Sequence, residues 1–220
     1  MNVETPIAPE IINDEFAGYL TSIASQPEIV TILETGSAEG TGSTAAIVAG
    51  CRKNPISQAL FCIEVSKLRF AKLKNLYAED SDWMFFYNGS SVKLKDFMTV
   101  GQIRAFYSEH KTQLNNYPLN QVLEWLTEDI QAATVAKQDL IHQIKGEWRI
   151  EHFDMVMLDG SAFTGWAELQ AVIGARFICL DDVNDIKSHR SFSYLVNDPA
   201  YDLLVANPSL RNGYAIFQRK

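Results

Sequence analysis

The stretch "LETGSAEGTGST" (residues 33–44) decides the fold, because it joins an apolar run to three closely spaced glycines, Gly36, Gly40 and Gly42. Before it, "EIVTILETG" (28–36) is a β-branched and almost continuously apolar run, typical of a strand buried on both faces. After it, "GSTAAIVAGCRK" (42–53) is predicted to form a helix. Glycine lets the backbone come close to another group, so the stretch predicts a strand, a ligand-contacting loop and a helix.

The same alternation continues along the chain. Apolar runs predict further strands at 59–65, 83–91, 153–160 and 175–182. Helices are expected at 10–25 and 66–77, the second with Ser66 as N-cap and one face formed by Phe70, Leu73, Leu76 and Tyr77. Strands that alternate with helices indicate a parallel α/β sheet with right-handed crossovers.

Two regions depart from this alternation. Runs at 201–206 and 214–220 flank a loop with Asn212-Gly213, which predicts an antiparallel pair at the sheet edge. Residues 92–152 are longer than a crossover needs and are predicted to be a helical insertion, with one face formed by Leu123, Leu126, Ile130 and Ala133. Such an insertion either covers the ligand crevice or serves packing and dimerisation.

Composition limits the class of protein. With 220 residues, 47% hydrophobic and 21% charged, the chain fits a single globular domain over 1–220. Its net charge of −8 argues against nucleic acid and against an anionic membrane surface as partners. The N-terminus shows no signal-peptide pattern, and no apolar stretch is long enough to span a membrane. Cys51, Cys62 and Cys179 lack zinc spacing, so buried reduced thiols in a cytoplasmic protein are expected.

The glycine spacing excludes the common phosphate-binding loops. GxGxxG requires glycines at relative positions 1, 3 and 6, whereas here they stand at 1, 5 and 7, and no Lys follows as in a P-loop. Glu64, at the end of the next predicted strand, could accept two hydrogen bonds from a ribose diol, since ligands bind at the carboxyl ends of parallel strands. A surface or capping acid is the alternative for Glu64.

The ordered motifs "ETGSAEGTGST", "IEVSKLRFAKLKNL", "YNGSS", "DMVMLDG" and "LDDV" resemble class I S-adenosylmethionine-dependent methyltransferases. The resemblance covers about residues 28–100 and 150–220 and is strongest to the catechol O-methyltransferase-like and macrolide-sugar O-methyltransferase branches. It implies a Rossmann-like, seven-stranded, mostly parallel sheet. The residues that it assigns to the cofactor site are Glu34, Gly36, Ser37, Gly40, Ser43, Thr44, Glu64, Val65, Gly89, Ser90, Ser91 and Asp159.

A carboxylate cluster follows from the last two parallel strands. Asp159 ends one strand and Asp181 and Asp182 end the next, so their like charges require a cation or raised pKa values. Mg²⁺ prefers oxygen ligands, and the resemblance likewise implies a Mg²⁺ site here. The ion would bind substrate oxygens and lower the pKa of a hydroxyl. The alternative is that one or two of these aspartates cap loops and no metal binds.

The catalytic base is less evident than the cofactor site. The catechol-type enzymes have a Lys near the acid of the fourth strand, and many relatives have a His two residues after it, but this chain has no Lys nearby and has Ser161 at that position. Asp159 and His189 are the predicted catalytic residues, with Asp185 as another candidate for the base. Phe163 and Trp166 either shape an acceptor pocket or belong to the core.

These motifs predict an S-adenosylmethionine-dependent O-methyltransferase, assisted by a divalent metal, that acts on a small hydroxylated acceptor such as a sugar or a phenol. A homodimer is plausible on the helical insertion and the N-terminal helix. Two alternatives remain open: a cofactor-binding domain without catalytic activity, and a nicotinamide-dependent oxidoreductase. The glycine spacing and the lack of a Tyr-x-x-x-Lys pair count against the oxidoreductase.

Overall fold

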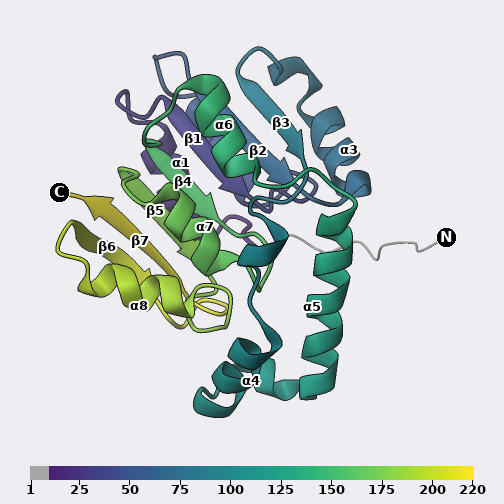
Figure 1. The fold of residues 1–220 in the computed structure, drawn as a ribbon. Coiled ribbons are helices and arrows are strands. Elements are labelled where there is room, and N and C mark those ends of the chain that lie inside the picture. The colour runs from purple at the N-terminus through teal and green to yellow at the C-terminus, as the bar shows by residue number, and fades with distance from the viewer. Residues whose placement is uncertain (1–9) are drawn as a thin grey trace.

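A seven-stranded sheet with the order β3-β2-β1-β4-β5-β7-β6 runs through the computed structural model, which describes residues 10–220 (Figure 1). The strands are β1 (Thr31–Thr35), β2 (Ala59–Glu64), β3 (Met84–Asn88), β4 (Met155–Leu158), β5 (Phe177–Asp181), β6 (Tyr201–Asn207) and β7 (Tyr214–Arg219). β1 to β5 are parallel, whereas β7 is antiparallel to both β5 and β6. The predicted sheet, with its antiparallel C-terminal pair at the edge, is therefore confirmed.

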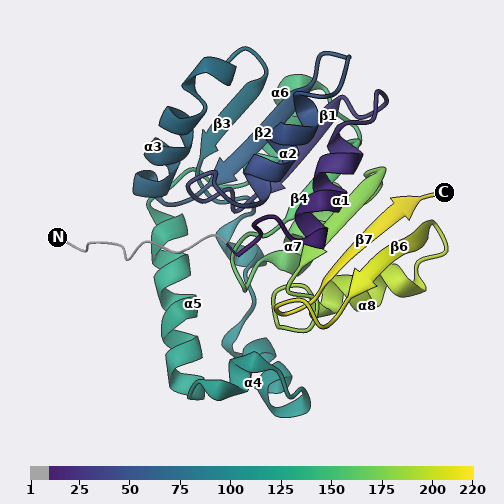
Figure 2. The ribbon, with the colours of Figure 1, turned by 180° about the vertical axis from the view of Figure 1, so that it is seen from behind.

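The central strands are apolar because helices cover both of their faces. In β1, Ile32 and Leu33 are fully buried, and Leu33 pairs with Phe61 of β2 on one side and Val156 of β4 on the other. Figures 1 and 2 show α6 (Leu140–Trp148), α7 (Gly165–Val172) and α8 (His189–Asn197) over one face. The opposite face carries α1 (Glu15–Ala24), α2 (Ser43–Cys51) and α3 (Lys67–Leu76).

Two predicted helices differ in detail from the structure. α1 begins at Glu15 rather than at residue 10, because Asp14 acts as its N-cap and accepts a hydrogen bond from the Ala17 amide at 2.8 Å. α3 has the predicted N-cap, Ser66, but only part of the predicted buried face. Leu73 is buried, whereas Leu76 is 53% exposed. α3 covers the edge of the sheet next to β3, so only a narrow stripe of the helix meets the core.

The insertion at 92–152 is helical, as predicted. It contains α4 (Val100–Glu109), α5 (Leu119–Thr134) and α6, with short 3₁₀ turns at Leu94–Asp96 and Gln113–Asn116. α6 is the crossover helix that lies on the sheet, whereas α4 and the adjoining end of α5 project beyond the carboxyl ends of the parallel strands (Figure 1). On α5, Leu126 and Ala133 are buried as expected, and Leu123 and Ile130 are partly buried.

Cys51, Cys62 and Cys179 are buried free thiols, as the sequence predicts. Among residues 10–220, no helix combines the length and apolar character needed to cross a membrane. The prediction that no signal peptide is present depends on residues 1–9, which lie outside the described residues.

Candidate functional site

A cavity of about 350 Å³ lies at the carboxyl ends of the parallel strands. This volume falls within the range of small-molecule sites, and the position is the one that open α/β sheets use for ligands. Predicted cofactor-site residues that line the cavity are Gly36, Ser37, Ser43, Glu64, Val65, Gly89, Ser90, Ser91 and Asp159. The predicted metal ligands Asp181 and Asp182 line the same cavity.

The glycine loop is fitted closely to the ends of both neighbouring strands. The amides of Gly36 and Ser37 donate to the Ile63 carbonyl of β2 at 3.0 and 3.1 Å. Gly36 has φ +74°, and a Cβ at this position would lie 1.9 Å from the carbonyl oxygen of Asp159. Only glycine combines this backbone conformation with such a close approach. The first glycine therefore serves the contact between the β1 loop and β4.

Glu34, Gly40 and Thr44 do not line the cavity. Their contacts hold the glycine loop between β1 and α2 in place. Glu34 is fully buried and accepts hydrogen bonds from the hydroxyls of Ser43 at 2.7 Å and Thr44 at 2.6 Å. Burial raises the pKa of Glu34, although these hydroxyls oppose the shift. The Tyr77 hydroxyl donates to the Gly40 carbonyl at 2.7 Å. These contacts fix the loop between β1 and α2.

Glu64 holds the other side of the cavity. Its Oε2 accepts a hydrogen bond from the Ala38 amide at 2.9 Å, and its Oε1 accepts one from the Ser66 amide at 2.7 Å. Carboxylate oxygens accept hydrogen bonds, which is the chemistry that the hydroxyls of a ribose diol require. The side chain is thus oriented by the glycine loop and by the start of α3, and its chemistry fits the ribose of S-adenosylmethionine.

Glu168 of α7 connects three of the loops around the cavity, although the sequence does not single it out. Its buried carboxylate accepts hydrogen bonds from Thr35 at 3.0 Å, from Thr164 at 3.1 Å and from Ser91. Burial raises the pKa of Glu168, against the effect of these hydroxyls. It links the end of β1, the turn after β3 and the loop after β4.

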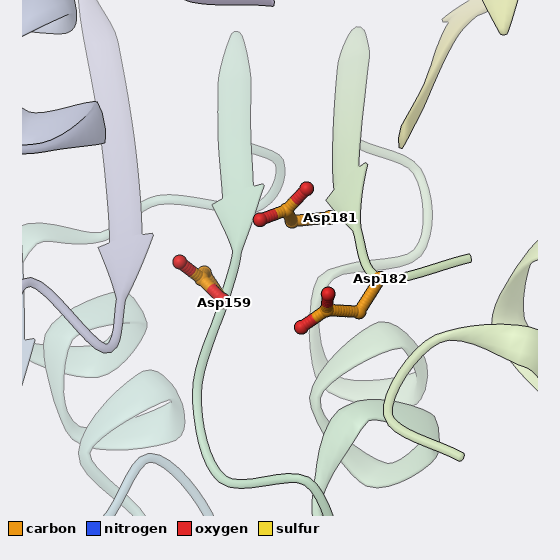
Figure 3. A group of neighbouring side chains, drawn as sticks. All are labelled: Asp159, Asp181 and Asp182. Atoms are coloured by element: carbon orange, nitrogen blue, oxygen red, sulfur yellow. The ribbon is translucent and has the colours of Figure 1, made fainter. Parts of the chain in front are cut away.

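Figure 3 shows Asp159, Asp181 and Asp182 grouped at the ends of β4 and β5. Each offers a carboxylate oxygen, and the three oxygens lie within 4.8 Å of one another. Asp182 has φ +56°, a left-handed conformation that aspartate tolerates better than most residues. The predicted convergence of the three carboxylates at one rim of the sheet is confirmed.

Two basic side chains that the sequence analysis missed lie within this carboxylate cluster. Lys187 Nζ is 2.6 Å from Asp159 Oδ1 and 2.6 Å from Asp182 Oδ2. Arg211 Nη2 is 3.0 Å from Asp181 Oδ1, and its Nη1 contacts the carboxylate of Asp14. All three carboxylates are therefore already paired with a cation from the chain.

Burial and mutual repulsion shift the pKa values within the cluster. Burial raises the pKa of Asp159 to about 6 against the effect of Lys187, and burial together with the neighbouring aspartates raises that of Asp181 to about 7. Burial alone would raise the pKa of Asp182, but Lys187 outweighs it and the pKa is lowered. Burial would also lower the pKa of Lys187, yet Asp159 and Asp182 raise it, so the ammonium stays charged.

The donor set as it stands does not fit a divalent ion. The oxygens have the right chemistry, since Mg²⁺ prefers carboxylate ligands in octahedral geometry at 2.0–2.1 Å. However, the Lys187 ammonium bridges Asp159 and Asp182, and Arg211 holds Asp181. An ion at the three carboxylates would lie beside the Lys187 ammonium, and two buried cations at short separation repel each other.

The predicted base His189 lies outside the cavity lining. Its ring is 4.5 Å from that of His110, centroid to centroid, at the contact between α8 and the projecting α4. Asp185 is also outside the lining and accepts hydrogen bonds from Thr112 Oγ1 and the Ile186 amide. Phe163 belongs to the buried core, and Trp166 packs against that core. Neither aromatic residue lines the cavity.

The insertion contributes directly to the cavity. Asp129 and Ala133 of α5 are part of its wall, and Asp129 Oδ2 accepts a hydrogen bond from Ser161 Oγ in the loop after β4. Burial raises the pKa of Asp129, while the Ser161 hydrogen bond opposes the shift. The α5 part of the insertion therefore forms part of the cavity wall.

Comparisons with known proteins agree with this fold. No protein-family model and no curated protein matches the sequence. An O-methyltransferase from Bacillus cereus, solved in complex with SAH, is 12% identical, with a TM-score of 0.57 over 97% of this chain and 84% of its own. The cofactor-bound protein Rv0187 from MTB is 16% identical, with a TM-score of 0.60 over 98% of this chain and 84% of its own.

A third solved structure, a putative caffeoyl-CoA O-methyltransferase from Staphylococcus aureus, is 12% identical, with a TM-score of 0.57 over 99% of this chain and 87% of its own. Similarity at these identities concerns the fold. The chain has the same Rossmann-like α/β fold as these solved methyltransferases, and the fold that its sequence motifs implied is therefore confirmed.

Proposed function

We propose that the protein transfers a methyl group from S-adenosylmethionine to a hydroxyl oxygen of a small acceptor, a sugar or a phenol. The observation that carries this proposal is the continuity of the cavity. One wall contains the glycine loop and Glu64, and the same cavity extends to Asp159, Lys187 and Asp129. A nucleoside-binding half and a charged half thus share one space, as a reaction between two bound substrates requires.

The first half suits the cofactor, which supplies an electrophilic methyl group when bound. The Glu64 carboxylate would accept hydrogen bonds from the ribose hydroxyls. Ser90 and Ser91 in the turn after β3 would border the adenine, and the loop at Gly36–Ala38 would border the methionine portion. Support for these roles comes from the lining of the cavity and from the fold shared with a SAH complex.

The second half suits a hydroxylated acceptor. An acceptor hydroxyl must lose its proton as the new C–O bond forms, so carboxylates at hydrogen-bond distance are useful as bases. Asp159 is the predicted catalytic residue, and Asp129 faces the same space from α5. His189 could take part only after a movement, because it does not line the cavity. Lys187 supplies positive charge beside Asp159.

Metal assistance by Mg²⁺ on Asp159, Asp181 and Asp182 remains a prediction from the sequence. The proposal does not depend on it, because Lys187 and Arg211 already neutralise part of the carboxylate charge.

Calorimetric titration of S-adenosylhomocysteine tests the cofactor site. We expect micromolar binding to the wild type and about 10- to 100-fold weaker binding to Glu64→Gln, because charge-assisted hydrogen bonds contribute about 1.5–3 kcal/mol. Glu28→Gln is a matched control, since Glu28 is outside the lining and pairs with Arg176 at 3.1 Å. Absence of binding to the wild type would refute the proposal, whereas binding without turnover on any acceptor would favour the non-catalytic alternative.

A further inference from the structure

Lys187 occupies an unusual position for a lysine. Its side chain is only 16% exposed, and its ammonium is 2.6 Å from a carboxylate oxygen of each of two residues, Asp159 and Asp182. The ammonium group of a lysine normally lies in water. Burial without charged or hydrogen-bonding partners strongly disfavours the charged form. Two close carboxylates compensate for that loss of hydration, so the ammonium is held as a fixed positive charge.

This ammonium bridges the two strands that would supply metal ligands. Asp159 follows β4 and Asp182 follows β5, and Figure 3 shows the two residues just beyond the ends of these neighbouring strands. A divalent ion bound by both would lie between the same two carboxylates that Lys187 Nζ contacts at Asp159 Oδ1 and Asp182 Oδ2. A buried dication and a buried ammonium at such short separation repel each other strongly. One cation therefore excludes the other.

The third carboxylate is also paired. Asp181 Oδ1 is 3.0 Å from Arg211 Nη2, and the same guanidinium contacts Asp14 ahead of α1. Release of Asp181 for a metal would disrupt a contact that joins the N-terminal segment to the C-terminal strand pair. Both cations come from the chain itself, and both are mostly buried, with Arg211 15% exposed.

We propose that Lys187 is the resident cation of this site: it takes the position between the strand ends where a divalent metal would bind, keeps such an ion out, and lets the site function without metal. The exclusion of metal follows from the pairing alone. One further consequence rests on the proposed function. Lys187 lines the cavity, and its ammonium has three N–H groups, two of which face Asp159 and Asp182. The third has no partner in residues 10–220 and is available to an acceptor oxygen.

Electron paramagnetic resonance of Mn²⁺ tests the proposal, because bound Mn²⁺ loses the sharp signal of the free ion. The wild type is expected to leave millimolar Mn²⁺ free, whereas Lys187→Ala removes the ammonium and is expected to bind one Mn²⁺ at least tenfold more tightly. Lys187→Arg keeps the charge and is expected to behave as the wild type. Adding Asp182→Asn to Lys187→Ala should abolish the new binding, which locates it at this cluster.

Two results would overturn the proposal. One is wild-type protein that binds Mn²⁺ as tightly as Lys187→Ala. The other is Lys187→Ala that is folded by circular dichroism and still binds no Mn²⁺, since something other than the ammonium would then exclude the ion. Neither readout needs a cofactor or an acceptor. Failure of S-adenosylhomocysteine binding would refute the proposed function and leave the Mn²⁺ result interpretable.

Discussion

The carboxylate of Asp129, on helix α5 of the insertion, accepts a hydrogen bond from the hydroxyl of Ser161, in the loop after β4. This contact joins the projecting part of the molecule to the sheet at the cavity that both line. It also brings a half-buried acid from the insertion to the side of the cavity where Asp159 and Lys187 lie.

Asp129→Asn is expected to affect the acceptor rather than the cofactor. The amide keeps the shape of the side chain but removes the negative charge. The kcat/KM for methylation of a phenol or sugar acceptor should therefore fall about 10- to 100-fold. The affinity for S-adenosylhomocysteine should stay within about twofold of wild type. Glu128→Gln, at the exposed neighbouring position, is the control. Equal losses in cofactor and acceptor binding would contradict an acceptor role for Asp129.

Two glycine-to-alanine substitutions test whether the close backbone contact at Gly36 contributes to stability, with a helical glycine as the control. Gly36→Ala adds a Cβ that would lie 1.9 Å from the Asp159 carbonyl at φ +74°, so it should destabilise the protein by roughly 2 kcal/mol or more and weaken S-adenosylhomocysteine binding. Gly18→Ala, within α1, meets nothing within 4 Å and should be neutral or stabilise by about 0.5–1 kcal/mol. Urea unfolding and calorimetry measure both. Unchanged stability in Gly36→Ala would show that the loop does not depend on this contact.

The pH dependence of stability should report the buried Asp181. Burial and the neighbouring aspartates raise its pKa from 3.8 to about 7 in the folded protein. The folded state therefore binds more protons than the unfolded state between about pH 4 and pH 7, and stability falls as the pH rises through this window.

Asp181→Asn removes this titration, so its free energy of unfolding relative to wild type should rise by roughly 4 kcal/mol between pH 4 and pH 8. Denaturant unfolding at a series of pH values measures the difference. Asp202→Asn, whose side chain is 64% exposed on β6, should show no such trend. A pH-independent difference for Asp181→Asn would mean that the carboxyl is ionised throughout.

Glu168→Gln should loosen the loops around the cavity. The substitution replaces one of the two oxygens that accept hydrogen bonds from Ser91, Thr35 and Thr164. Loss of a buried acceptor leaves a hydroxyl unsatisfied, with an expected cost of about 1–3 kcal/mol. Urea unfolding measures this cost, and hydrogen exchange should increase in the turn at Ser90 and Ser91. Exchange that increased uniformly over the chain instead would argue against a local role.

Much of the fold could be predicted because burial leaves a direct pattern in the sequence. Continuous apolar runs predict β1 to β5, since strands covered on both faces need apolar side chains on both sides. The convergence of Asp159, Asp181 and Asp182 follows from the same reasoning, because parallel strands end at one edge.

Lys187 could not be found in this way. It lies 28 residues from Asp159 along the chain, and only the path of the loop after β5 brings the two together. No lysine stands next to Asp159 in the sequence, whereas the run "DDVNDIK" (181–187) places Lys187 five residues after Asp182. Asp129 and Glu168 were missed for a similar reason, because single acids on amphipathic helices look like solvated residues until the packing is known.

His189 was predicted to be a catalytic residue, but it lies outside the cavity lining. Its place after the aspartate pair suggested proximity to the site, but α8 begins at this residue and the His189 ring lies against His110, which directly follows α4. Nearness in the sequence does not set the direction of a side chain at the start of a helix.

The most direct test of the proposed activity is mass spectrometry of acceptors incubated with the protein and S-adenosylmethionine in the presence of EDTA. The proposed function predicts a sugar or phenol that gains one methyl group on a hydroxyl oxygen, together with an equal amount of S-adenosylhomocysteine. Methylation only on nitrogen, or no methylated product from any hydroxylated acceptor by a protein that binds the cofactor, would contradict it.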